Sequence, residues 1–503
     1  MRKILFTLML LVAATATMMA YDFEVDGIYY KLESDGVNIN DGNEVSVTYK
    51  TTSYNSYTGD VIIPAEVTYN GTTYYVNEIG VSAFRDCKGL TSVTIPNSVI
   101  NIFSHAFHGC SGLTCIDIPN SVIMIADNAF YGCTGLTSVF IPTSVMYIGG
   151  SFTGCTGITN FTVSLDNEHY DSRDNCNAII DTYHNALVEG CKNSVIPNSV
   201  TAIGADAFNS CSSLMSIDIP NSVTTIGDCA FFECTGLDSI IIPNSVTHIG
   251  MGAFYGCIGL ASINIPNSVT NIDQGAFYGC SGVTSISIGS SITSIDFPDW
   301  GIDCSVLTNI TVDSGNSYFD SRNGSNAVIE TSSNTLLYGC KNTIIPNSVT
   351  TIADYAFSGC SGLTSIDIPN SVTSIGNNAF YNCRGLTSIV CLATTPPSTG
   401  DQVFYTWSTP NIYENATLFV PAESLEAYQS HEEWGIFTHI VPFLGAGPGD
   451  INGDGNIAIS DVTNLIDTLL SGDELPAYAD VNGDGNVGIK DVTDLIDMLL
   501  NGN

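Results

Sequence analysis

The sequence predicts an α/β repeat solenoid followed by a small all-α domain. Two observations favour the solenoid: the dipeptides Ala-Phe and Ile-Pro each recur every 23 residues within three blocks of the chain. A third observation predicts the all-α domain, because two nearly identical acidic segments, starting at Asp450 and Asp480, each run into an apolar pattern of helical period. A repeat of this length cannot bury its apolar side chains alone, so we expect stacked repeats to share one core.

Residues 1–20 have the pattern of a secretory signal peptide. A basic start, Met-Arg-Lys, precedes an apolar run over residues 4–14, and small residues follow it. This run is too short to span a bilayer, and no later run reaches the roughly 18 residues that a transmembrane helix needs. We therefore expect cleavage before Tyr21, secretion to the extracellular space and no direct membrane insertion.

Residues 21–79 are expected to form a β-rich cap, because the first coil of a repeat array would otherwise expose its core. Apolar and polar residues alternate in this segment, as they do in half-buried strands. Asn70-Gly71 lies between two Thr/Tyr-rich runs, which is typical of a β-hairpin turn.

The repeat unit itself combines a strand, a turn, a second extended stretch and one helical turn. In the unit Leu237–Cys257, Ile240 and Ile242 lie on one side of a strand, and Pro243 ends that strand because it has no backbone donor. The Ala-Phe dipeptide and the closing cysteine have the spacing of one helical turn. The Ala-Phe copies end at Phe84, Phe107, Phe130, Phe208, Phe231, Phe254, Phe277, Phe357 and Phe380.

Most of the 17 cysteines recur in register with the repeat. One cysteine per repeat at a fixed position is interpreted as a small buried apolar residue in the stack. The cysteines outside this register leave room for one or two disulfides in an exported chain. These are Cys115, Cys176, Cys191, Cys229, Cys340 and Cys391.

Two longer segments, Asn160–Ile196 and Asn309–Ile345, interrupt the array. They resemble each other, since both contain the sequences Asp-Ser-Arg and Gly-Cys-Lys-Asn, and the regular repeat resumes directly after each. We interpret them as variant repeats rather than inserted domains.

The repeat pattern L-x-x-[IV]-x-I-P-x-S-V-x-x-I-x-x-x-A-F-x-x-C resembles the BspA-like family of leucine-rich repeats. The resemblance covers Gly80–Ile389, and we place the solenoid at residues 80–390. It implies a secreted adhesion protein whose repeat surface recognises a protein or a glycan.

The predicted ligand surface is the outward face of the strands, where Ser and Thr prevail and a sparse row of other side chains is interspersed. The alternative is a solvated β-face without a ligand. A row of asparagines after the Ile-Pro dipeptides, such as Asn244, is interpreted as a turn-capping ladder. The candidate ligand-binding residues are Asp117, Phe140, Asp218, Asp238, Asn264 and Asp367.

Residues 391–444 depart from the repeat and are expected to form a C-terminal cap that includes a helix from Ser424. Residues 445–449, Gly-Ala-Gly-Pro-Gly, form a linker, and residues 450–503 a separate domain.

This domain contains two loops with oxygen-bearing side chains at positions 1, 3, 5 and 12 and glycine at position 6. Such loops suit calcium, a hard cation that takes six to eight oxygen ligands, and position 7 adds a backbone carbonyl. We therefore predict two Ca²⁺ ions as cofactors. The candidate ligands are Asp450, Asn452, Asp454, Asn456 and Asp461 in the first loop, and Asp480, Asn482, Asp484, Asn486 and Asp491 in the second.

An amphipathic helix follows each loop, with apolar residues at Val462, Leu465, Ile466, Leu469 and Leu470 and again 30 residues later. A duplicated loop–helix with Asp at position 12 resembles the type I dockerin family, which implies calcium-dependent docking onto a cohesin module. The alternative is a structural calcium clip for the solenoid. The candidate partner-binding residues are Ile459, Ser460, Ile466, Asp467, Ile489, Lys490, Ile496 and Asp497.

Composition excludes several classes of function. With 12 Lys+Arg against 50 Asp+Glu, a formal net charge of −38, the chain cannot neutralise phosphates, so nucleic-acid binding is not expected. No catalytic residues are predicted, because the sequence contains no nucleophile elbow, P-loop or Rossmann fingerprint. We expect a non-catalytic binding protein, and we expect any attachment to a cell surface to occur through the dockerin. The alternative is an accessory component of an extracellular polysaccharide-degrading complex that targets substrate or regulates an enzyme.

Overall fold

The computed structural model describes residues 20–32, 43–51, 54–295, 305–406, 411–443, 451, 457–471, 479, 481 and 487–501. The chain divides into two compact units, Met1–Ile302 and Asp303–Asn503, and each is described by itself. The expected linker 445–449 and all but the last residue of the expected signal peptide lie outside the described residues. Within the described ranges, no helix has both the length and the apolar character needed to cross a bilayer.

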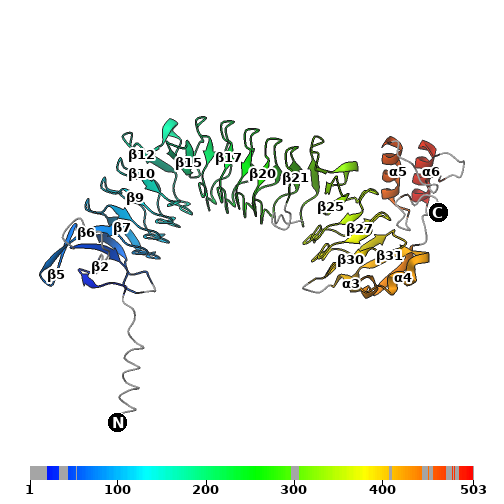
Figure 1. Ribbon diagram of the computed structural model, residues 1–503, viewed down its shortest axis with the longest axis horizontal. Helices are drawn as coiled ribbons and strands as arrows, with labels where there is room; N and C mark the ends of the chain where they lie inside the picture. Colours follow the sequence, from blue (N-terminus) through cyan, green and yellow to red (C-terminus); the bar gives the residue numbers. More distant parts are fainter. Residues whose placement is uncertain are drawn as a thin grey trace, which may run out of the picture. The chain divides into compact units, whose positions relative to one another are not determined.

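A β-sheet opens the first unit and continues into the repeat coils (Figure 1). The strands before the repeats are β1 (Phe23–Val25), β2 (Ile28–Leu32), β3 (Glu44–Thr48), β4 (Gly59–Ile62), β5 (Glu66–Tyr69) and β6 (Thr72–Ile79). β5 and β6 form the predicted hairpin, and its turn residues Asn70 and Gly71 have φ angles of 49° and 81°. β6 pairs with the first short repeat strand, β8 (Asn101–Ile102), so the N-terminal strands cover the first coil directly.

The regular coils contribute short parallel strands, and several of them also contribute a longer parallel strand (Figure 1). The longer strands of the first unit are β7 (Leu90–Thr94), β10 (Ser138–Ile141), β12 (Asn160–Val163), β19 (Ser262–Asn264) and β21 (Ser285–Ile288). The short strands are β9 (Met124–Ile125), β11 (Tyr147–Ile148), β16 (Ala202–Ile203), β17 (Thr225–Ile226), β18 (His248–Ile249) and β20 (Asn271–Ile272). Their register equals the sequence period, since Ile203 pairs with Ile226 and Ile226 with Ile249. The predicted repeat solenoid is confirmed.

A continuous ladder of stacked phenylalanines fills the core of the coils. In the first unit, Phe231 lies 5.2 Å from Phe208 and 5.3 Å from Phe254, measured between ring centroids, and the planes are almost parallel. In the second unit, Phe380 stacks on Phe357 and also on Phe404, which extends the ladder past the last Ala-Phe copy. The aromatic residue of each repeat is therefore a core residue that joins neighbouring coils.

The in-register cysteines are buried, as predicted, but they also donate hydrogen bonds. The thiol of Cys133 donates to the carbonyl oxygen of Phe107 in the preceding coil at 3.0 Å, and Cys257 does the same to Phe231 at 3.1 Å. The same bond is made by Cys110, Cys155, Cys234, Cys280 and Cys383. The column is thus a polar ladder inside an apolar core.

The sequence predicts free thiols for the cysteines in register with the repeat and allows disulfides for the others. This prediction is wrong at one position. Cys360, an in-register cysteine, is disulfide-bonded. The other described cysteines are all free, including the off-register Cys115, Cys176, Cys191, Cys229, Cys340 and Cys391, so the partner of Cys360 lies outside the described residues.

Serine makes a ladder of hydrogen bonds at the turn after Ile-Pro, and Asn267 caps the turn of the next coil, since its Oδ1 accepts a hydrogen bond from the amide of Ser290 at 2.8 Å. Ser245 donates its hydroxyl to the carbonyl oxygen of Val223 in the preceding coil at 2.6 Å, and Ser268 donates to Val246 at 2.6 Å. Asn244, between Pro243 and Ser245, is exposed. Each serine side chain therefore ties its turn to the coil before it.

The two longer segments form matching variant coils. In the first unit these are β13 (Tyr170–Asp171), η1 (Arg173–Asn175), β14 (Ile179–Asp181) and β15 (Ala186–Glu189). In the second unit they are β23 (Phe319–Asp320), η2 (Arg322–Gly324), β24 (Val328–Glu330) and β25 (Thr335–Tyr338). Each set runs antiparallel and then returns to parallel pairing with the next regular coil. Their similarity confirms that both are variants of one repeat.

Regular coils and a mixed C-terminal layer make up the rest of the second unit. Its further strands are β22 (Asn309–Val312), β26 (Thr351–Ile352), β27 (Ser365–Ile368), β28 (Ser374–Ile375), β29 (Ser388–Cys391), β30 (Ser398–Thr399), β31 (Thr417–Pro421) and β32 (His439–Phe443). Its short helices are α3 (Ile412–Asn415), η3 (Ala422–Ser424), α4 (Leu425–Gln429) and η4 (Trp434–Ile436). The buried Trp434 ring packs on Phe404 at the end of the aromatic ladder, so this layer covers the last coil.

Two amphipathic helices of equal length, α5 (Ile459–Ser471) and α6 (Ile489–Asn501), complete the described part of the second unit. They lie side by side and share a small core with Ile451 and Ala479 (Figure 1). Leu465 of α5 and Leu495 of α6 are its fully buried centre.

Candidate functional site

Asp461 and Asp491, the residues predicted at position 12 of the two loops, occupy equivalent places in α5 and α6. Both carboxylates are buried. Oδ2 of Asp461 accepts a hydrogen bond from the amide of Ala458 at 2.8 Å, and Oδ2 of Asp491 accepts one from the amide of Gly488 at 2.8 Å. Oδ1 of Asp491 also accepts from the amide of Val481 at 2.9 Å, so this side chain contacts both arms of its loop.

These two carboxylates fit the predicted calcium centres. Burying a carboxylate costs free energy unless hydrogen-bond donors or a cation compensate its charge. Ca²⁺ requires an oxygen ligand at position 12 of such a loop. The other eight candidate ligands, Asp450, Asn452, Asp454, Asn456, Asp480, Asn482, Asp484 and Asn486, lie outside the described residues. Among the residues that are described, no group of three or more His, Cys, Asp or Glu side chains could hold a metal ion.

A pair of matching apolar surfaces lies on the outside of α5 and α6. Ile459 is 76% exposed and its counterpart Ile489 is 82% exposed. The remaining candidate partner residues are exposed as well, namely Ser460, Ile466, Asp467, Lys490, Ile496 and Asp497. The two surfaces differ in charge at two places, because α6 has Lys490 where α5 has Ser460 and Asp494 where α5 has Asn464.

The helices bury a narrower stripe than the sequence predicts. Leu470 belongs to the predicted apolar side of α5, but it is 81% exposed, and its counterpart Leu500 is 77% exposed. One helix pair without further layers can cover only the sides that face each other, so the outer part of each stripe remains in water. Leu470 and Leu500 therefore join the candidate partner surface.

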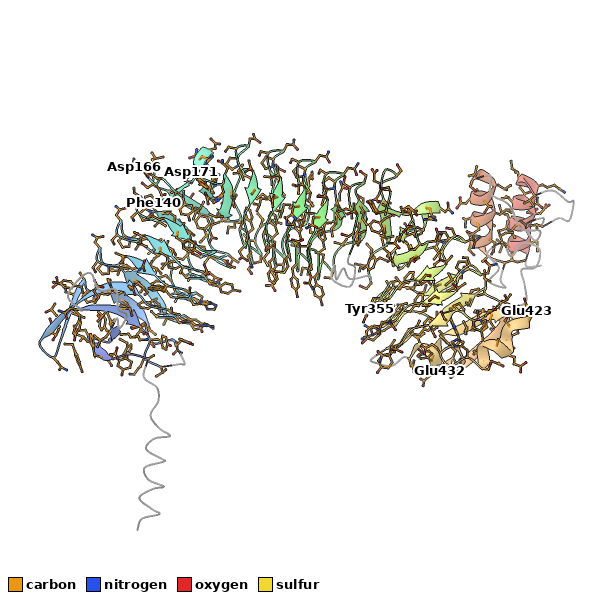
Figure 2. All side chains as sticks on the ribbon, in the orientation of Figure 1. Phe140, Asp166, Asp171, Tyr355, Glu423 and Glu432 are labelled. Carbon is orange, nitrogen blue, oxygen red and sulfur yellow. The ribbon has the colours of Figure 1, made fainter. Side chains whose placement is uncertain are left out.

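The six candidate residues of the strand face are all exposed. Phe140 lies on β10, where Figure 2 labels it, and Asn264 lies on β19. Asp218 forms an isolated β-bridge with Ile241. Neither Asp117 nor Asp238 lies on a named strand. Asp367 lies on β27 of the second unit. The structure therefore places five of them in the first unit and one in the second.

Two large apolar residues at the same register as Phe140 were not singled out in the sequence. Ile62 at the end of β4 and Ile241 are both more exposed than Phe140. They occupy the position between the two inward residues of the strand, so their exposure could have been predicted from alternation. The outward face combines isolated apolar side chains with acidic ones.

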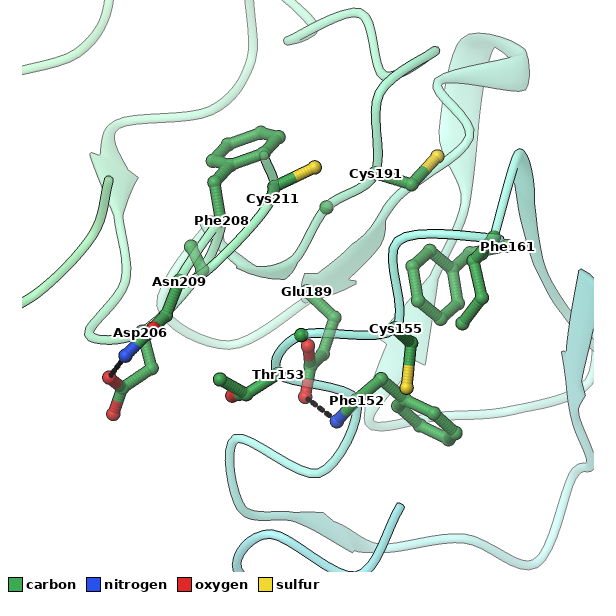
Figure 3. A pocket seen from close by; sticks show the side chains of 14 residues that line it. Phe152, Thr153, Cys155, Phe161, Glu189, Cys191, Asp206, Phe208, Asn209 and Cys211 are labelled. Carbon is green, nitrogen blue, oxygen red and sulfur yellow. Dashed lines mark hydrogen bonds between the residues drawn. The ribbon is translucent and has the colours of Figure 1, made fainter. Parts of the chain in front are cut away.

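A buried carboxyl group, Glu189 on β15, was also missed. Figure 3 shows it among Phe152, Cys155 and Phe161, beside a cavity of about 10 Å³, close to the room that one water molecule needs. Its Oε1 accepts a hydrogen bond from the amide of Phe152 at 3.1 Å. Burial raises the pKa of Glu189 to about 8, although the amides of Phe152 and Ser151 act in the opposite direction.

Two family descriptions match the sequence. The description "BspA type Leucine rich repeat region" matches in six copies over residues 63–179, 180–300 and 330–418, which is more than half of the chain. The description "Dockerin type I domain" matches residues 448–500. No curated protein matches the chain.

Several solved structures match the chain. A leucine-rich repeat protein from Bacteroides ovatus is 26% identical with a TM-score of 0.44, and the alignment covers 84% of this chain and 100% of that one. A leucine rich cell surface protein from Faecalibacterium prausnitzii is 28% identical with a TM-score of 0.37, covering 58% and 94%. A leucine-rich repeat protein from Eubacterium ventriosum is 19% identical with a TM-score of 0.40, covering 71% and 93%.

Proposed function

Because the chain belongs to the BspA type leucine rich repeat family and ends in a type I dockerin domain, we propose that it is a secreted, non-catalytic adhesion protein held on a cohesin-bearing scaffold or surface protein. Leucine-rich repeat regions are binding modules, and dockerins are docking modules. The dockerin implies a cohesin partner, and the repeat region implies a ligand of its own.

The duplicated outer surface of α5 and α6 carries this proposal. Ile459 and Leu470 on one helix, and Ile489 and Leu500 on the other, leave large apolar side chains in water although the helices are short. Exposed apolar side chains that cluster in this way are typical of protein-binding surfaces. Because the same residue types recur at the same positions, each helix can present an equivalent surface to a cohesin.

Calcium supports this surface by fixing the loops from which the helices start. Type I dockerin domains bind calcium. We infer two ions, one per loop, with Asp461 and Asp491 as the last ligand of each. The cation would neutralise three carboxylates in each loop, and the buried Asp side chains would then hold each loop against the first turn of its helix.

The ligand of the solenoid is proposed to contact the outward strand face. In the first unit this face presents Asp117, Phe140, Asp218 and Asn264 together with Ile241. Isolated apolar and aromatic groups among acidic and hydroxyl side chains can bind a protein or a glycan. The net charge of −38 favours ligands with positive charge over acidic ones.

The docking proposal is tested with the full chain as bait against the surface and secreted proteins of the producing organism, in calcium and then in chelator. We expect capture of a cohesin-bearing protein in calcium only. The variant I459A/L470A/I489A/L500A should lose capture at least about tenfold, while T463A/T493A, on exposed positions of the same helices, should retain it. Capture that persists in chelator and also with the quadruple variant would refute the proposal.

The identity of the captured assembly distinguishes the two roles proposed for the chain, adhesion and participation in a polysaccharide-degrading complex. A scaffold that also carries polysaccharide-degrading enzymes would make the chain an accessory component of that complex. A scaffold that carries other adhesins would make it a surface adhesin.

A further inference from the structure

One exposed register position differs between the first three regular coils and the rest of the array. It is the residue after the buried valine of the Ser-Val dipeptide. The first three coils have Ile100, Ile123 and Met146 there. All other regular coils with a described short strand after Ser-Val have threonine, namely Thr201, Thr224, Thr247 and Thr270 in the first unit and Thr350 and Thr373 in the second.

The three apolar residues lie in adjacent coils, each directly before a short strand (β8, β9 and β11). The amide of Ile123 donates to the carbonyl oxygen of Ile100 at 2.9 Å, and the amide of Met146 donates to that of Ile123 at 2.8 Å. Their exposed fractions are 38%, 42% and 56%. We call Ile100, Ile123 and Met146 the apolar stripe; the exposed Tyr147 ring lies at its end.

Stacking of the coils does not explain the stripe. Where threonine occupies this position, its hydroxyl bonds to the preceding coil, as Thr247 does to the carbonyl oxygen of Thr224 at 3.3 Å. Ile and Met cannot make this bond, and they place apolar area in water instead. Three such replacements in successive coils form a contiguous patch, which is the mark of an interaction surface. Methionine also adapts its shape readily to a partner.

We propose that the apolar stripe binds an amphipathic α-helix of another protein, with Lys and Arg beside its apolar residues. Neighbouring strands lie about 4.8 Å apart, so the three side chains span about 10 Å along the array. An α-helix repeats its apolar positions about every 5.4 Å, and three of them span about 11 Å. A bound strand would repeat its side chains about every 6.7 Å and fall out of register by the third residue.

The charges beside the stripe favour a basic helix over a second copy of this chain. Glu78 accepts a hydrogen bond from the Asn101 side chain at 3.0 Å, and Asp127 accepts one from the Tyr147 hydroxyl at 3.1 Å. These carboxylates border the stripe on β6 and on the coil that contains β9. Two copies with a net charge of −38 each would repel one another, whereas a cationic helix is attracted to the same surface.

This site goes beyond the proposed docking function. It belongs to the sheet of short strands in the first unit, whereas the docking surface is on α5 and α6, and it requires no calcium. Loss of one interaction therefore leaves the other measurable.

The test is titration of the full chain with a synthetic helix-forming peptide that has leucines at i, i+3, i+4 and i+7 and lysines and arginines on both flanks. The key variant is I100T/I123T/M146T, which installs the residue that the other coils have at this position and leaves the charge unchanged. Circular dichroism checks that it folds. We expect the affinity of the variant for the peptide to fall at least about tenfold.

Two controls separate the stripe from general attraction between opposite charges. A scrambled peptide of the same composition should bind the unchanged chain at least about tenfold more weakly, because its leucines no longer share one face. The variant T224A/T247A/T270A, at the same register outside the stripe, should bind the peptide as the unchanged chain does. Equal affinity of the unchanged chain and I100T/I123T/M146T, or equal binding of both peptides, would overturn the proposal.

Discussion

The carboxyl group of Glu189 occupies the place of a backbone carbonyl in the stack below Phe152. In regular coils the amide of the ladder phenylalanine donates to an alanine carbonyl of the next coil, as Phe107 does to Ala129 at 2.7 Å. The coil after Phe152 is the longer variant, and there Oε1 of Glu189 accepts the amide hydrogen at 3.1 Å instead (Figure 3). The Glu189 side chain thus supplies the acceptor for the Phe152 amide where the regular repeat is interrupted.

We predict that the buried carboxyl group of Glu189 makes the stability of the first unit depend on pH. Burial raises the pKa of Glu189 from 4.5 to about 8, so the folded chain retains a proton that the unfolded chain releases. The associated stability is complete below about pH 4.5 and is lost as the pH rises to about 8, by an amount on the order of 5 kcal/mol. E189Q keeps the acceptor without the charge, so its thermal midpoint should exceed that of the unchanged chain at about pH 8 and match it near pH 5.

Thermal unfolding followed by circular dichroism across this pH range checks the prediction. E168Q, which removes an exposed carboxyl of the same variant coil, should leave the pH dependence as it is. A pH dependence that is identical in E189Q and the unchanged chain would contradict it.

The cysteine ladder predicts an unusual order of substitutions at Cys133. C133A leaves a small cavity and removes one of the two donors of the Phe107 carbonyl, which keeps only the Cys110 amide, so we expect a loss of about 2 kcal/mol. C133S keeps a donor and should be more stable than C133A. Denaturant unfolding of the three chains measures the difference. If the column acted only as an apolar filler, serine would be the worse replacement, because its hydroxyl would be buried without need.

Thiol reactivity should separate the cysteines by position. Burial raises the pKa of Cys87, Cys211 and Cys280 to about 12, which leaves almost no thiolate at neutral pH. Among the described cysteines of the folded chain, only the exposed Cys115 and, more slowly, the half-buried Cys229 should react with a thiol reagent. Counting labelled sites by mass spectrometry before and after denaturation tests this, and rapid native labelling of the ladder cysteines would disprove it.

The regular parts of the fold were predictable because one period fixes several columns at once. The spacing of 23 residues placed Phe231 and Phe254 in one core column, and the structure stacks them at 5.3 Å. The donor role of Cys257 was not predictable, since it depends on the contact between neighbouring coils, where the thiol becomes a second donor to the Phe231 carbonyl beside the Cys234 amide. Glu189 was hidden for the same reason: its partner exists only because two different coil types meet there.

The candidate docking surface was predictable in kind but not in extent. Helical spacing identified α5 and α6 and placed Leu470 on the apolar side of its helix, but it did not show that the structure leaves Leu470 in water. Periodicity gives the direction of an apolar side, whereas the width that is buried depends on how many neighbours pack against the helix. On the strand face, by contrast, alternation alone is enough to place Ile62 and Ile241 on the outward side.

The last prediction concerns the buried aspartates that end the two loops. D461N and D491N keep the volume of the side chain and remove its charge, so each should weaken calcium binding at its own loop by at least about tenfold. Calcium titration calorimetry should show two sites in the unchanged chain and one in each variant. Far-ultraviolet circular dichroism should show calcium-dependent helix formation that the double variant loses, since each loop positions the first turn of its helix. D467N/D497N, exposed on the same two helices, should bind calcium as the unchanged chain does. Undiminished binding in D461N/D491N would show that these carboxylates serve only the backbone amides of their loops.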